Sequence, residues 1–287
     1  MLDVRPLTAD DLDAARGLST QAGWNQIAAD WKRFLRLSPT GCFAGVVDDE
    51  VVATTAVITY GTDVSWIGMV LVDERHRGQG YGSRIFERGL EYAERKGGSV
   101  IGLDATHLGE PIYRNYGFEP VEPVSRWQGT LRRAERPAED RAGPERIERI
   151  SAEDVDPVRG FDRERVGVDR SVLLRELLEE PDVYGYVARE STAITGYAVV
   201  RPGRTDRQIG PVVAGRAETV DSLLRAVGAD FDGEDVIVDA PDRTVVSDSL
   251  ERVGLTRDRE LVRMTYPRPE SALSTDAVYA LLDFAFG

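Results

Sequence analysis

Three glycines at alternate positions, Gly78, Gly80 and Gly82, follow directly after Arg77. Glycine has no Cβ atom, so the backbone amides of such a segment can approach an anion closely. The segment leads into a predicted helix, whose amino-terminal dipole favours negative charge, and Arg77 adds a cation suited to a phosphate oxygen. We therefore predict a cradle for a pyrophosphate, although a turn that merely connects a strand to a helix would also contain such glycines.

The elements expected around this loop are an antiparallel meander before it and a helix after it. Short polar turns separate the strand-like segments, which favours hairpins over the helix-linked parallel strands of a dinucleotide fold. In the first half we expect strands at 2–5, 43–47, 51–60, 65–72 and 99–105, two helices within 9–37, and helices at 82–96 and 110–116.

The loop resembles the R-x-x-G-x-G signature of the GNAT superfamily of N-acetyltransferases, with Arg77, Gly80 and Gly82 in the fixed positions. A second feature of that family is a tyrosine four residues before a Gly-Phe pair. Tyr113 stands at that distance before the pair at 117–118. Two motifs in the expected order make coincidence improbable.

This resemblance implies transfer of an acetyl group from acetyl-CoA to a primary amine of a small molecule, by direct attack in a ternary complex. Tyr113 matches the acid that protonates the departing thiolate, with simple packing under the loop as the alternative. The pantetheine arm would lie along the preceding strand, as an added strand would. The residues implied at the acetyl-CoA site are Val70, Leu71, Val72, Arg77, Gly78, Gln79, Gly80, Tyr81, Gly82 and Ser83.

The general base and the acceptor pocket are less clearly marked. Many GNAT enzymes carry a glutamate on the strand before the loop, and the segment 65–72 contains none. Asp104 on the next strand is the candidate carboxylate, with a structural role or a water relay as alternatives. Trp24 and Asn25, between the two early helices, are candidates for the acceptor pocket, and a core tryptophan beside a capping asparagine is the other interpretation.

The second half repeats the element order of the first half without the glycine signature. The expected elements are a helical region at 151–180, strands at 184–189, 194–200, 208–213 and 236–240, and helices at 218–229 and before Gly254. This predicts an α+β chain of two GNAT-like units, each with a mixed, mostly antiparallel sheet flanked by helices. The second unit would be degenerate, serving either to complete the acceptor pocket or as a structural lid or dimerisation module.

The domain boundaries follow from composition. The catalytic unit is expected at 1–131, and a charged, proline-containing linker at 132–146. The degenerate unit is expected at 147–268. The tail at 269–287 is expected to form a helix that docks on the body, because Val278, Leu281, Leu282 and Ala285 recur at helical spacing.

The composition of the chain argues against several kinds of partner and site. A net charge of −14 disfavours nucleic acid and anionic membranes as partners. One cysteine and two histidines argue against a metal site, and the acidic amino terminus is unlike a signal peptide, which indicates a cytoplasmic protein. A homodimer is left open.

Two other functions compete with the acetyltransferase hypothesis. A CoA-binding sensor without turnover would fit the missing strand glutamate and the degenerate second unit. A nucleotide-binding oxidoreductase could use the same glycines, but it would require a parallel βαβ unit, which the expected meander disfavours.

Overall fold

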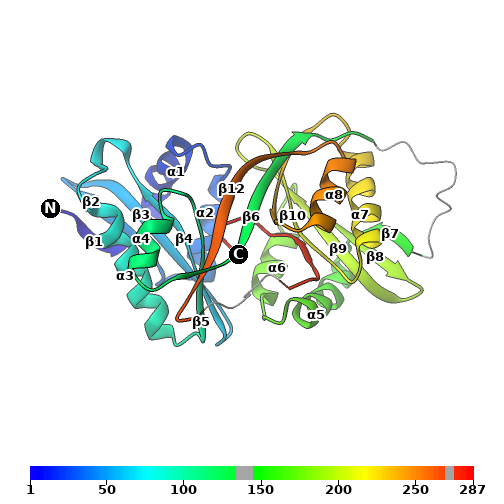
Figure 1. Cartoon of the computed structure of the whole chain (residues 1–287), viewed down its shortest axis with the longest axis horizontal. Helices are drawn as coiled ribbons and strands as arrows, with labels where there is room; N and C mark the ends of the chain where they lie inside the picture. The colour runs from blue at the N-terminus through cyan, green and yellow to red at the C-terminus, as the bar shows by residue number, and fades with distance from the viewer. Residues whose placement is uncertain (134–144, 269–274) are drawn as a thin grey trace.

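The computed structural model describes residues 1–133, 145–268 and 275–287. Two halves lie side by side, and the described strands form one continuous sheet through both of them (Figure 1). The first half contains β1 (Asp3–Pro6), α1 (Leu12–Gln21), α2 (Ala28–Leu37), β2 (Cys42–Val47), β3 (Glu50–Tyr60), β4 (Val64–Val72), α3 (Tyr81–Lys96), β5 (Val100–Ala105), α4 (Glu110–Asn115) and β6 (Glu119–Thr130).

The second half has the same order of elements. It contains β7 (Glu145–Arg149), α5 (Val155–Val166), α6 (Ser171–Leu178), β8 (Tyr184–Glu190), β9 (Ala193–Arg201), β10 (Arg207–Ala214), α7 (Ala217–Asp230), β11 (Asp235–Pro241), α8 (Thr244–Arg252) and β12 (Thr256–Tyr266), and β13 (Val278–Ala280) follows. The expected duplication of an α+β unit is confirmed. Strand β7 was not predicted, since it begins inside the segment expected to be a linker, most of which lies outside the described residues.

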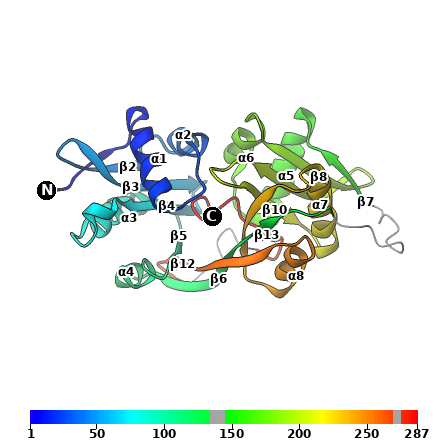
Figure 2. The ribbon, with the colours of Figure 1, turned by 90° about the horizontal axis from the view of Figure 1, so that it is seen from above.

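Local sequence accounts for the elements that support the glycine loop. Strands β2, β3 and β4 pair antiparallel, which confirms the expected meander. Helix α3 buries Ile85, Phe86 and Ala93 at helical spacing against the sheet and ends at Gly97, whose φ of 75° closes it. Figure 2 shows α1 and α2 over one face of this half of the sheet and α3 over the other.

The last strands of the two halves are exchanged. Strand β5 pairs with β12 from the second half, and β11 pairs with β6 from the first half. Strands β6 and β12 also pair with each other at the centre of the molecule, where Figure 1 shows both crossing between the halves. Each unit's sheet is therefore completed by a strand from the other unit. The expected division into separate units, with boundaries at residues 131 and 147, did not include this exchange.

Two equivalent buried ion pairs hold the exchanged strands in register. The Arg263 guanidinium of β12 donates from Nε and Nη2 to the Asp104 carboxylate of β5, at 2.9 Å each. In the second half, Arg126 of β6 donates in the same way to Asp239 of β11, at 2.7 Å each. Bidentate pairs of this kind need both partners in fixed geometry.

The described part of the tail consists of a short strand and turns and contains no helix, so the helix predicted there is wrong within residues 275–287. Strand β13 pairs antiparallel with β10, and the side chains on both of its faces are buried. The tail does pack against the body. Asp283 accepts a hydrogen bond from Arg201 at 2.5 Å, and Arg201 also donates to Asp30 of α2 at 2.8 Å.

Among the described residues, no helix combines the length and the apolar character that a membrane crossing requires.

Candidate active site

The glycine loop connects β4 to α3 and exposes its backbone. Gly78 and Gly80 both have a φ of 76°, a conformation that residues with a Cβ atom rarely adopt, and both are exposed. The Arg84 amide donates back to the Gly80 carbonyl at 3.2 Å. The preceding amides of the first helical turn have no carbonyl one turn earlier to bind, so this end of α3 is suited to an anion.

Strands β4 and β5 separate beside this loop. They pair in parallel only at Val64, Ser65 and Trp66, and β4 then continues alone on that side to Val72. A β-bulge interrupts the pairing of β4 with β3 at Met69 and Val70, and Met69 has a φ of 54°. The separation leaves an open strand edge at Val70, Leu71 and Val72, next to the glycine loop.

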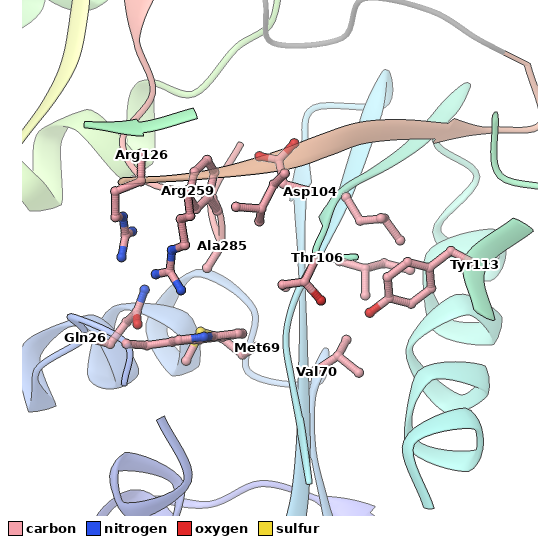
Figure 3. Close-up of a pocket in the computed structure, with 15 residues that line it drawn as sticks. Gln26, Met69, Val70, Asp104, Thr106, Tyr113, Arg126, Arg259 and Ala285 are labelled. Atoms are coloured by element: carbon pink, nitrogen blue, oxygen red, sulfur yellow. The ribbon is translucent and has the colours of Figure 1, made fainter. Parts of the chain in front are cut away.

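A pocket lies in and beyond this gap between the strands. The space between its walls is roughly 670 Å³, open solvent at the mouth included. Val70 of β4, Asp104 and Thr106 at the end of β5, and Tyr113 of α4 form one side, and Met69 of β4 lies nearer to Gln26 (Figure 3). The other side contains Trp24, Gln26, Arg126, Arg259, Leu261, Phe284 and Ala285.

Tyr113 borders the pocket from α4. Its ring packs against Phe86 of α3 with centroids 4.7 Å apart, and Figure 3 shows its hydroxyl directed into the pocket. Burial raises the pKa of Tyr113 to about 12. The phenol therefore remains protonated throughout the physiological range and can donate a proton.

Asp104 lines the pocket but is held by the neighbouring strand. Its side chain has no exposed surface, and both carboxylate oxygens accept hydrogen bonds from Arg263. Burial raises the pKa of the Asp104 carboxyl, and the charge of Arg263 opposes this effect. As a general base, Asp104 would have to weaken this ion pair, so its geometry indicates a positioning residue.

Comparison with family models identifies both halves. Residues 9–118 match the acetyltransferase (GNAT) family model, and residues 158–280 match a second acetyltransferase (GNAT) domain model. The chain belongs to the GNAT family. It contains two GNAT domains in tandem, as the two motifs and the repeated element order had indicated, and this family of acyltransferases typically uses acyl-CoA donors.

Similar proteins share the tandem arrangement or the length of the chain. The holothin acyltransferase of a Pseudoalteromonas species is 24% identical over 238 residues, 83% of this chain and 78% of that protein. A Pyrococcus horikoshii structure, solved as a candidate acetyltransferase, covers 100% of this chain and 96% of its own, with 19% identity and a TM-score of 0.83. A tandem GNAT protein from the clavulanic acid biosynthesis pathway covers 92% of this chain and 98% of its own, with 14% identity and a TM-score of 0.65.

The second GNAT domain has a corresponding gap between strands, and the chain's own tail fills it. Strand β10 pairs in parallel with β11 only up to Ile209. Beyond that point β13 lies against β10, and the Leu281 amide donates to the Asp239 carbonyl at 2.8 Å. Only residues 215–216 connect β10 to α7, whereas residues 73–80 connect β4 to α3.

Of the two predicted acceptor residues, Trp24 lines the pocket and Asn25 does not. The Asn25 side chain instead joins the two GNAT domains, donating to the Asp206 carbonyl at 2.9 Å and accepting from the Thr205 amide at 3.0 Å. Sequence reasoning missed Gln26, next in the chain, as well as Arg126 and Arg259. The last two come from the exchanged strands, and no motif in the sequence marks them.

Proposed function

We propose that this GNAT protein transfers an acetyl group from acetyl-CoA to a primary amine of a small molecule. The observation that carries the proposal is that Val70, on the open edge of β4, and Tyr113 line one pocket, and that this strand edge leads directly into the glycine loop. The similarity to a relative named for acyl transfer to holothin supports a small acceptor.

The first domain has the features that bound acetyl-CoA needs. The main-chain amides of residues 78–83 and the guanidinium of Arg77 would hold the diphosphate. The free edge of Val70, Leu71 and Val72 would hold the pantetheine arm by strand-like hydrogen bonds. Acetyl-CoA supplies the activated acetyl thioester.

Tyr113 acts as the general acid in this proposal. Its neutral phenol faces the pocket, and its hydroxyl forms no hydrogen bond within the part of the chain that the structure describes. The proton is therefore available for the thiolate that leaves when the amine attacks.

The amine reaches the site in its neutral form. Among the described residues, the only carboxylate that lines the pocket is Asp104, which is bound to Arg263, and no histidine lines it. The ammonium proton is thus lost to water before attack. Asp104 holds the end of β5 in position through its ion pair.

The second domain shapes the acceptor side of the pocket and binds no CoA. Its gap between strands is filled by β13, and it supplies Arg259, Leu261, Phe284 and Ala285 to the pocket of the first domain. The backbone of the tail approaches β4 so closely that a Cβ atom on Gly68 would lie 2.5 Å from the Ala285 carbonyl oxygen.

A thiol-release assay with acetyl-CoA and a panel of small amines tests the proposal. We expect release of free CoA with at least one primary amine and a matching acetylated product by mass spectrometry. Tight binding of acetyl-CoA without thiol release for any amine would instead indicate a CoA-binding sensor.

A further inference from the structure

Two arginines face each other across the exchanged strands at one end of the pocket. Arg126 of β6 and Arg259 of β12 are direct cross-strand partners. Figure 3 shows both guanidinium groups directed toward Gln26, at the opposite end from Tyr113. Like charges placed opposite each other destabilise a sheet, so this arrangement calls for a compensating anion.

Only one of these two charges forms an ion pair within the described residues. Arg126 is neutralised by its bidentate pair with Asp239. Arg259 forms no hydrogen bond or ion pair within residues 1–133, 145–268 and 275–287, and its Nε is buried without a partner. Within the described residues, a partly buried cation is thus left unpaired at the pocket. Such a group is costly unless a ligand pairs with it.

Gln26 adds a second unsatisfied polar group beside these arginines. Gln26 is only 5% exposed, and its Oε1 has no hydrogen-bond partner in the part of the chain that the structure describes. Phe284 provides an apolar wall, with its ring 5.2 Å from the Cζ of Arg126. The Gln26 Oε1 can only accept, so the Nε2 amide group is the part of this side chain that would donate to an anion. Together with a guanidinium that can donate two parallel hydrogen bonds, it matches the two oxygens of a carboxylate.

We propose that Arg259 and Gln26 bind a carboxylate on the acceptor, so that the substrate is a primary amine that also carries a carboxylate group. This inference rests on the proposed function. The carboxylate lies at the arginine end of the pocket and the amine lies toward Tyr113. Because Arg259 belongs to the second domain, that domain selects the acceptor while the first domain holds acetyl-CoA.

The test compares amino acids with their carboxamides. The acceptors are glycine, β-alanine, 4-aminobutyrate, 6-aminohexanoate and a panel of L-α-amino acids, each beside the corresponding amide, in the thiol-release assay. We expect kcat/KM for at least one acid to exceed that of its amide by about 10-fold or more, since a charged hydrogen-bonded contact distinguishes them.

Variants of the arginine separate recognition from folding. Arg259→Gln is expected to raise KM for the preferred acid by about 10- to 100-fold with kcat little changed, as loss of uniform binding does. KM for the amide should change by no more than about 2-fold, and Arg259→Lys should recover part of the loss. Arg257→Gln is the control, because Arg257 lies on the same strand, pairs with Asp242 and does not line the pocket.

Calorimetric titration with acetyl-CoA distinguishes failure of the carboxylate inference from failure of the proposed function. If acetyl-CoA binds and neutral amines are acetylated as well as the acids, the proposed function stands and the carboxylate inference is overturned. Binding of acetyl-CoA with no turnover of any acid also overturns it, as does an equal effect of Arg259→Gln on acid and amide. If acetyl-CoA neither binds nor releases thiol, the proposed function fails first.

Discussion

Replacing Arg263 with methionine tests whether the exchanged strands depend on their buried ion pairs. Arg263 and Asp104 have no exposed side-chain surface, and two hydrogen bonds of 2.9 Å join them. Arg263→Met leaves the Asp104 carboxylate desolvated and without its bidentate partner, which costs about 3–5 kcal/mol. At about 2–4 °C per kcal/mol for chains of this order of size, the melting temperature should fall by about 6–20 °C.

The measurement is urea and thermal unfolding at pH 5 and pH 8, with Arg257→Met as the exposed control. Loss of the control's surface pair with Asp242 should cost about 0–1 kcal/mol. Burial already raises the pKa of Asp104, and without Arg263 nothing opposes that effect. A carboxyl whose pKa is raised in the folded state destabilises the protein as the pH rises through that pKa. The stability that Arg263→Met loses relative to the wild type should therefore be larger at pH 8 than at pH 5.

The double variant Asp104→Leu/Arg263→Met should recover most of the lost stability, because neither charge is then buried alone. If Arg263→Met is as stable as Arg257→Met at both pH values, the ion pair does not hold β12 against β5. The structural reasoning about the exchange would then be refuted.

Further predictions concern the chemistry and the tail. Tyr113→Phe should lower kcat by about 10²- to 10⁴-fold in steady-state assays while the calorimetric Kd for acetyl-CoA is unchanged; an unaltered kcat would remove Tyr113 as the acid. In the wild type, kcat/KM should rise with pH to a plateau at the pKa of the acceptor amine, and a downturn below about pH 10 would contradict the raised pKa of Tyr113. Deleting residues 275–287 should lower the melting temperature and raise the acceptor KM, because the tail forms part of the pocket wall. A fragment of residues 1–131 should unfold without a cooperative transition, because its β5 has no β12 to pair with. A sharp unfolding transition of this fragment would show that the first unit folds alone.

Local sequence signals predicted the elements around the glycine loop because each signal acts over a few residues. Apolar positions such as Ile85 and Phe86 recur at helical spacing, and the glycines that follow β4 mark the turn before α3. The same criterion gave the wrong prediction for the tail. Its apolar residues fit a helix, but a strand covered on both faces is equally apolar, and periodicity alone does not distinguish the two.

Local signals of this kind could not predict the strand exchange or the side of the pocket that contains Gln26, Arg126 and Arg259. No local pattern tells which neighbours β6 and β12 pair with, since edge pairing depends on the assembled sheet. Gln26, Arg126 and Arg259 come from three segments far apart in the chain, and only that pairing brings them together. The sequence marked Asp104 as a candidate, but not the arginine that binds it.

A crystal structure with coenzyme A bound tests the central claim most directly. The account predicts the diphosphate against the main-chain amides of residues 78–83 and the pantetheine arm beside β4 at Val70, Leu71 and Val72, with no second molecule between β10 and β11. Coenzyme A seated in the second domain, or bound away from the glycine loop, would contradict it.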